Sequence, residues 1–148
     1  PGISDTVLRL VTASREVLLV VTNEPASIVD AYAMIKTLHE DYGVSSFNLV
    51  VNMVKTQQEG REIHTRLWNI VDRFLDVNIR FAGCIPEDDA LKKAVQRQKA
   101  VVQAYPRSKA SIAFRNMASK VDGWPLPMTP RGNLEFFLES LVQRSVNA

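Results

Sequence analysis

Three apolar segments, each separated from the next by an amphipathic segment, constrain the fold of this chain more than any other feature. They are rich in β-branched residues and cover residues 16–22, 47–53 and 77–85. Their apolarity is continuous, without strict alternation of polar residues, and this is typical of strands that are covered on both faces. The sequence therefore predicts three strands of a parallel sheet.

The segments between these strands have helical periodicity. Residues 27–43 open with a capping box formed by Ser27 and Asp30 and close on Gly43, and residues 59–77 repeat the amphipathic pattern. The apolar positions expected to face the sheet are Ile28, Ala31, Tyr32, Ile35 and Leu38 in the first helix, and Ile63, Leu67, Ile70, Val71 and Phe74 in the second. Alternating strands and helices predict right-handed βαβ units in a three-layer α/β fold with flanking helices.

The chain changes character after the third strand. A helix over residues 87–95 carries three acidic residues at its start, where they complement the helix dipole, and two further helical stretches follow. We expect residues 1–122 to form the α/β domain, the proline-rich residues 123–132 a connector, and residues 133–148 a C-terminal amphipathic helix.

Composition excludes several classes of protein. The chain has 148 residues, of which 46% are hydrophobic, so one domain with a real core is expected. It contains no apolar run of membrane-spanning length and no charged leader ahead of its first helix, which indicates a cytosolic protein. Cys84 ends an apolar strand and is expected to be buried and inert. His39 and His64 are far apart and lack a cysteine partner, so we predict no metal site.

Positive charge is concentrated in one part of the chain. Residues 90–121 contain eight basic side chains and no acidic one, although the net charge of the whole chain is only +2. The eight are Lys92, Lys93, Arg97, Lys99, Arg107, Lys109, Arg115 and Lys120. Such a block is either a solvated helical face or a docking surface for an acidic partner or a phosphate-bearing surface. Specific nucleic-acid binding is not expected, because the net charge is only +2 and few aromatic residues are interleaved with the basic ones.

Ligands of parallel α/β sheets bind beyond the carboxyl ends of the strands. At these ends Asn52 has an amide that can pair with the N6/N7 edge of adenine, and Pro86 offers a rigid apolar shelf. The backbone N–H groups of residues 87–89 would supply further donors. An asparagine after a strand also commonly bonds its own turn, so the residues alone leave both interpretations of Asn52 open.

Four segments are informative in combination and order: "VVTNEPASIVDAYAMIK", "NLVVNMV", "GCIPEDDALKKAV" and "YPRSKASIAF". Together they resemble the second half of the MinD/ParA-type deviant P-loop ATPases, and within that family the flagellar-number regulators. The resemblance covers essentially the whole chain. It implies a partial SIMIBI-type P-loop NTPase fold that lacks its N-terminal βα units. Pro1 and Gly2 would then end a switch loop, and about half of the domain would precede them.

The resemblance also implies site residues. Gly2 matches a switch glycine near the γ-phosphate of the nucleotide, Asn52 matches an adenine-recognising asparagine, and Pro86, Glu87 and Asp88 match a loop beside the base. ATP and Mg²⁺ are expected in the full-length parent. The chain itself contains no GxxxxGK[ST] motif, so the family's P-loop and Mg²⁺ ligands would precede Pro1. We therefore expect no catalytic or metal-binding residue in this fragment, no tightly bound cofactor and no ATP hydrolysis.

Further implications of the resemblance concern partners. Glu24, Pro25 and Asp30 match a motif of the ATP-bound homodimer and its partner surface, although capping by Ser27 and Asp30 explains part of that motif equally well. The charge pattern, rather than the resemblance, suggests that Lys92 and Lys93 contribute to a docking surface for an acidic partner or anionic lipid. The implied function is restraint of an AAA+ flagellar transcription activator by a cytoplasmic ATPase located at the inner membrane or the cell pole. A nucleotide-free protein-interaction module is the alternative.

The C-terminal segment has two interpretations. Leu134, Phe137, Leu138 and Leu141 form one apolar stripe, and the family resemblance implies reversible membrane contact through this helix. However, the polar side contains Glu135 and Glu139 against one arginine, whereas interfacial helices are usually basic. Packing of the stripe on the protein's own core or on a partner is the alternative.

Overall fold

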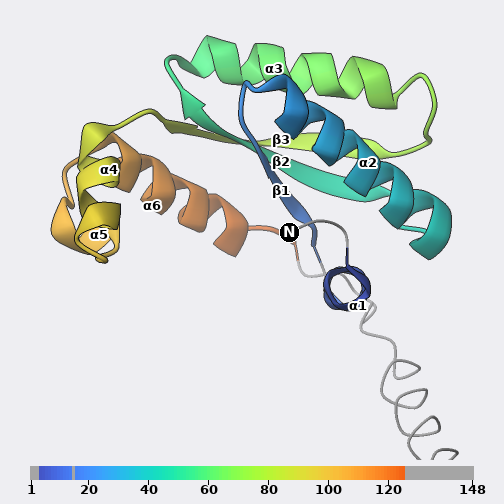
Figure 1. The fold of residues 1–148 in the computed structure, drawn as a ribbon, viewed down its shortest axis with the longest axis horizontal. Coiled ribbons are helices and arrows are strands. Elements are labelled where there is room, and N and C mark those ends of the chain that lie inside the picture. Colours follow the sequence, from blue (N-terminus) through green and yellow to red (C-terminus); the bar gives the residue numbers. More distant parts are fainter. Residues whose placement is uncertain (1–3, 15, 126–148) are drawn as a thin grey trace, which may run out of the picture.

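Helices and strands alternate in the order that the apolar pattern predicts. The structure, a computed structural model, describes residues 4–14 and 16–125. The elements in chain order are α1 (Asp5–Thr12), β1 (Leu18–Val21), α2 (Pro25–Tyr42), β2 (Ser46–Val54), α3 (Gln57–Val71), β3 (Asn78–Pro86), α4 (Asp89–Gln96), α5 (Val101–Ala104) and α6 (Lys109–Asp122). The short helix α5 turns the chain between α4 and α6 (Figure 1).

The strands form one parallel sheet in the order β1-β2-β3. Leu18 pairs with Asn48 in β2, and Ser46 at the start of β2 pairs with Asn78 in β3. Helices α2 and α3 lie over one face of the sheet, and α6 packs against β3 on the other side (Figure 1). The predicted three-layer α/β fold with a parallel sheet is therefore confirmed.

Each face of the sheet has its own apolar core. The larger core joins β1, β2 and β3 to α1, α2 and α3, and Phe47, Leu49 and Leu67 in it are fully buried. A smaller core on the other face joins β2 and β3 to α6 and includes Val50 and Ala110. Because neighbouring strand residues point to opposite faces, β2 needs apolar residues at consecutive positions to fill both cores.

The two-sided covering does not extend to β1. Leu18 and Val20 are 42% and 59% exposed, whereas Val21 on the same strand is buried. The prediction that all three apolar runs are covered on both faces is therefore wrong for β1. The reason is that α6 packs against β3, which lies at the opposite edge of the sheet from β1.

Helix α2 begins two residues earlier than the predicted capping box. Pro25 occupies the first helical turn, and Glu24 is the N-cap residue without a side-chain cap bond. Ser27 lies inside the helix, and its hydroxyl accepts a hydrogen bond from the backbone N–H of Thr22 at 3.0 Å. The predicted capping box of Ser27 and Asp30 is therefore wrong, whereas Gly43 ends α2 in the left-handed conformation as predicted.

Helix α3 ends earlier than predicted. Thr56 is its N-cap and Val71 its last residue, and the backbone N–H groups of Phe74 and Leu75 both bond to the carbonyl of Val71 in the following turn. Ile63, Leu67 and Val71 are buried as predicted, but Ile70 and Phe74 are 39% and 71% exposed. Phe74 faces outward because it lies beyond the helix, where the helical period no longer applies.

Several predictions concern residues outside the described ranges. These are the switch-loop assignment of Gly2 and the apolar stripe of Leu134, Phe137, Leu138 and Leu141. Among the described helices, none is long and apolar enough to cross a membrane.

Candidate nucleotide-base site

A pocket of about 330 Å³ lies at the carboxyl ends of β2 and β3, beside the start of α4. Its volume is within the range of small-molecule sites. The lining residues are Asn52, Met53, Pro86, Glu87, Asp88, Leu91, Lys92 and Val95. The structure thus brings together four residues that the sequence analysis selected, namely Asn52, Pro86, Glu87 and Asp88.

An irregularity in the sheet determines how Asn52 is presented. Val51 pairs with Cys84 and Val54 with Pro86, so Asn52 and Met53 lie together opposite Ile85. Such a bulge changes the direction of the side chains at the end of a strand. Met53 has a φ of 60°, a left-handed conformation that is uncommon for a residue with a side chain.

The amide of Asn52 is only partly used by the protein. Its Oδ1 accepts a hydrogen bond from the backbone N–H of Met53 at 2.9 Å, which supports the local bulge. Within the described residues, its Nδ2 has no hydrogen-bond partner. Asn52 therefore bonds its own turn, as one interpretation expected, and retains a donor for a ligand, as the other requires.

Asp88 holds the wall of the pocket in place. It is the N-cap of α4: its Oδ1 accepts from the N–H of Ala90 at 2.8 Å, and its Oδ2 accepts from the N–H of Ala110 in α6 at 2.9 Å. The pKa of Asp88 lies below its ordinary value because of these two backbone hydrogen bonds, of which the one from Ala110 has the larger effect. Since both carboxylate oxygens are used, Asp88 shapes the pocket rather than presenting a free charge to it.

Glu87 and Lys92 form an ion pair at the pocket rim, with Lys92 Nζ 2.8 Å from Glu87 Oε1. The pKa of Glu87 is lowered mainly by the hydrogen bond from Lys92 and then by the charge of Lys92. The same contact raises the pKa of Lys92. Asp89 lies 3.5 Å from the same ammonium group. The backbone N–H of Glu87 bonds to the carbonyl of Val54, so this predicted donor is not available to a ligand.

Glu59 is a residue that the sequence analysis missed. Its Oε1 accepts from Asn23 Nδ2 at 3.0 Å, and its Oε2 accepts from the backbone N–H of Lys55 at 2.7 Å. It therefore joins the loop after β1 to the loop after β2, at the carboxyl edge of the sheet. The only sequence feature that draws attention to Glu59 is its position three residues after Thr56. That spacing predicts a helix cap and not a bond between the two loops.

Glu24 and Asp30 line a second pocket, of about 420 Å³, at the start of α2 beside β1. Both residues are exposed, as is Pro25. This site lies next to β1, whereas the first pocket lies at the ends of β2 and β3. Its assignment to a dimer or partner surface remains a prediction.

All eight side chains of the basic block are exposed. The ammonium group of Lys92 is paired with Glu87 and Asp89, whereas that of Lys93 has no ion-pair or hydrogen-bond partner among the described residues. Other members contact the protein itself: Lys120 Nζ donates to the carbonyl of Ala82 at 2.9 Å, and the guanidinium of Arg97 lies over the ring of Tyr105. The charges available to a partner are therefore fewer than the sequence suggests.

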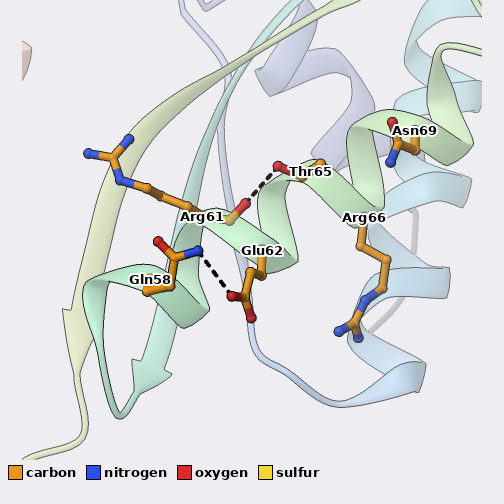
Figure 2. A pocket seen from close by; sticks show the side chains of 6 residues that line it. All are labelled: Gln58, Arg61, Glu62, Thr65, Arg66 and Asn69. Atoms are coloured by element: carbon orange, nitrogen blue, oxygen red, sulfur yellow. Dashed lines mark hydrogen bonds between the residues drawn. The ribbon is translucent and has the colours of Figure 1, made fainter.

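A third hollow, of about 370 Å³, lies on the outer face of α3 (Figure 2). All its lining residues come from that one helix, and two of them, Gln58 and Glu62, are hydrogen-bonded to each other at 3.0 Å. Arg61 extends away from Glu62 and lies over the ring of Phe81. The polar groups do not converge on a common point, so we assign no site to this hollow.

The remaining chemically distinctive residues have structural roles. Cys84 is buried as predicted, and burial raises the pKa of its thiol. The rings of His39 and His64 lie 3.1 and 2.9 Å from the carbonyl oxygens of Val44 and Ile79. In the part of the chain that the structure describes, no three potential ligands gather into a metal-binding group.

A pocket at the carboxyl ends of parallel strands is the arrangement of nucleotide-binding α/β proteins. The fold is similar to that of the MinD cell division protein of Aquifex aeolicus, with a TM-score of 0.59 and 24% identity over 80% of this chain and 48% of that protein. The chain therefore has an α/β fold that corresponds to about half of the MinD fold.

Sequence comparisons agree with this class. The chain is 55% identical over 142 residues to the antiactivator FleN of Pseudomonas aeruginosa, covering 96% of this chain and 51% of FleN. It is 28% identical to the flagellum site-determining protein YlxH of Helicobacter pylori, covering 92% of this chain and 47% of that protein. It is 25% identical to the septum site-determining protein MinD of Bacillus subtilis, covering 86% of this chain and 46% of that protein.

No protein-family model matches the chain. The chain spans about half the length of the curated relatives it matches. The similarity to FleN in sequence and to MinD in fold agrees with the resemblance to the MinD/ParA-type proteins that the sequence motifs indicate.

Proposed function

We propose that this chain supplies the base-binding half of an ATP-binding regulator of flagellar number. The observation that supports the proposal is the pocket in which Asn52, Pro86, Glu87 and Asp88 meet. The residues fit an adenine ring: Asn52 Nδ2 is a donor without a described partner, its Oδ1 can accept a second bond, and Pro86 lines the cavity.

The phosphates and Mg²⁺ would be held by other parts of the protein. No P-loop motif occurs in these 148 residues, and a P-loop is what cradles the phosphates and holds Mg²⁺. Bound Mg²⁺ would neutralise phosphate charge. The residues described here would bind and orient the base, and Asp88 would fix the loop that lines it.

The first experiment separates the two interpretations of Asn52. In the intact protein that carries this chain, Asn52→Asp keeps the oxygen that accepts from Met53 N–H and removes the Nδ2 donor. We expect ATP affinity to fall about tenfold, because a bidentate amide–adenine pair contributes roughly 1–3 kcal/mol of base discrimination. Calorimetric titration with ATP and Mg²⁺ measures the change, and the preference for ATP over GTP should decrease with it.

Asn69→Asp is the matched control, because Asn69 is exposed on α3 and lies outside the base pocket. It should leave ATP affinity unchanged. If Asn52→Asp also leaves ATP affinity unchanged while the protein stays folded, Asn52 has no part in binding the base. That result would favour the nucleotide-free interaction module.

The partner is the second part of the proposal. FleN is named an antiactivator, and 55% identity to it supports a transcription activator as the partner of the protein that carries this chain. We propose that the activator is of the AAA+ class and that the regulator dimerises when it binds ATP, using the Glu24 and Asp30 surface. The exposed cations of α4 to α6 would attract acidic groups on the activator.

Lys93 allows a test of this attraction, because it is exposed and has no described ion-pair partner. Lys93→Glu should slow association with the activator about threefold or more at low salt, since exposed charges act mainly on the association rate. The difference should shrink at high salt because of screening. Stopped-flow association kinetics with Lys36→Glu on α2 as the control would measure it, and equal rates for wild type and Lys93→Glu at low salt would contradict docking at this surface.

A further inference from the structure

Glu59 lies outside the base pocket but is bonded to two loops at the carboxyl edge of the sheet. Its Oε2 accepts a hydrogen bond from the backbone N–H of Lys55, in the loop after β2, at 2.7 Å. Its Oε1 accepts from Nδ2 of Asn23, in the loop after β1, at 3.0 Å. Each carboxylate oxygen of Glu59 therefore holds a different loop.

The backbone of Glu59 is fixed by the first turn of α3. The hydroxyl oxygen of Thr56, the N-cap residue, accepts from the N–H of Glu59 at 3.1 Å. The next residue, Gly60, lies directly against β3, because a Cβ atom added there would be 3.1 Å from Cβ and 3.3 Å from Sγ of Cys84. The start of α3 thus packs on the strand with no side chain between them, and the carboxylate is presented from a well-supported element.

The backbone that carries Asn52 requires support of this kind. Met53 has a φ of 60°, a left-handed conformation that is unfavourable for a residue with a side chain. Such a conformation persists only where surrounding contacts enforce it. The pairing with β3 ends at Val54, and the bond from Lys55 to Glu59 is made immediately beyond that point. This bond therefore anchors the C-terminal end of the strained segment.

We propose that Glu59 is a positioning residue for the base site. Through Lys55 it holds the bulge at Asn52 and Met53 in the conformation that binds adenine, and this inference rests on the function proposed above for the pocket. Asn23 takes part because its amide keeps the carboxylate of Glu59 in place. The loop after β1 thus contributes to base binding, although Asn23 does not line the base pocket.

Glu59→Ala, made in the intact protein that carries this chain, removes both bonds. We expect ATP affinity to fall about fivefold, because only molecules in which the bulge is already formed bind the base, and a bulge formed in about one fifth of the molecules gives this loss. GTP affinity should change less than about twofold, because the amide of Asn52 is matched to adenine. Calorimetric titration with each nucleotide in the presence of Mg²⁺ measures both affinities.

Glu59→Gln is the conservative variant. Its side-chain oxygen can accept from Lys55 N–H, and its amide can donate to Oδ1 of Asn23 once the amide of Asn23 is turned over. ATP affinity should stay within about twofold of wild type, because both bonds are kept in number. Gln58→Ala is the matched control on the same helical turn, since Gln58 bonds to Glu62 and to neither loop. It should leave ATP affinity unchanged.

A double-mutant cycle tests the role of Asn23. Asn23→Ala alone should lower ATP affinity about threefold, because Glu59 is then held at one oxygen only. In the Glu59→Ala background the same substitution should have no further effect, since Asn23 acts through Glu59. Additive losses would show that Asn23 acts independently of Glu59 and would overturn this part of the inference.

Hydrogen exchange provides a measurement without nucleotide. The backbone amides of residues 53–55 should exchange at least about fivefold faster in Glu59→Ala than in wild type, because the bulge opens more often. Gln58→Ala should exchange at the wild-type rate. Equal exchange in wild type and Glu59→Ala would show that the bulge does not depend on Glu59 and would overturn the inference.

Asn52→Asp separates failure of this inference from failure of the proposed function. In the Asn52→Asp background, Glu59→Ala should reduce ATP affinity less than about twofold further, because the group that Glu59 positions is already changed. If Asn52→Asp weakens ATP binding and Glu59→Ala does not, or if Glu59→Ala weakens ATP and GTP binding equally, the positioning role is overturned and the base site stands. If neither substitution changes ATP affinity, the base site and the positioning role are both overturned.

Discussion

Replacing Phe47 with alanine is expected to lower the free energy of unfolding by about 3–5 kcal/mol. Phe47 is the largest of the fully buried side chains, and it lies on β2, the central strand of the sheet. The substitution removes buried apolar area and leaves a cavity that neighbours such as Leu67 and Ile79 can fill only in part. Urea denaturation of the intact protein, followed by circular dichroism, would measure the loss.

Phe74→Ala is the control for this experiment. It makes the same chemical change at a side chain that is 71% exposed, in the turn after α3. We expect its effect to stay within about 0.5 kcal/mol, the usual range for surface substitutions. Similar losses for Phe47→Ala and Phe74→Ala would mean that the turn after α3 packs against the protein in a way that this structure does not contain.

Replacing Asp88 should affect both stability and the base pocket. Asp88→Ala removes the N-cap of α4 and the acceptor of Ala110 N–H in α6, so the loss should be about 2 kcal/mol for the two bonds together. Asp88→Asn keeps a side-chain oxygen that can accept one of the two bonds and should lose less. In both variants ATP affinity should fall because the pocket wall at Glu87 and Leu91 is no longer fixed.

The stability part of this effect depends on pH. The pKa of Asp88 is lowered from its ordinary value of 3.8 in the folded protein, so the charged form is favoured by folding. Its contribution is therefore complete above pH 3.8 and is lost as the pH falls through the lower folded-state pKa. The difference in unfolding free energy between wild type and Asp88→Asn should accordingly be largest at neutral pH and shrink in acid. A difference that is constant with pH would show that the carboxylate charge does not contribute.

The sequence predicts those features of the fold that depend on local patterns. β2 and β3 are recognised because both of their faces are buried, and Gly43 marks the end of α2 because only a left-handed residue fits there. The start of α2 was misplaced because Ser27 and Asp30 match a capping box, whereas Pro25, two residues earlier, suits the first helical turn. β1 was expected to be buried on both faces because its residues are apolar. The apolar pattern of a strand does not show how far a distant helix such as α6 extends over the sheet.

The candidate site was predictable in its members but not in their roles. The positions of Asn52, Pro86, Glu87 and Asp88 follow from the rule that ligands bind at the carboxyl ends of parallel strands, together with the family resemblance. The free Nδ2 of Asn52 depends on a bulge and on the left-handed Met53, for which the sequence contains no signal. The bonds from Asp88 to Ala110 and from Glu59 to Asn23 join residues that are 22 and 36 positions apart, so no local motif contains them.

The exposed strand β1 determines where further strands can be added to the sheet. In the described part of the chain, β1 pairs only with β2, while the base pocket lies on the far side of β2 at the ends of β2 and β3. A further parallel strand could join along β1, bury Leu18 and Val20 beneath its own helix, and bring new loops to the same carboxyl rim. The candidate base pocket and the exposed edge of β1 are thus separate, so a strand with its loops can be added along β1 without rebuilding the pocket.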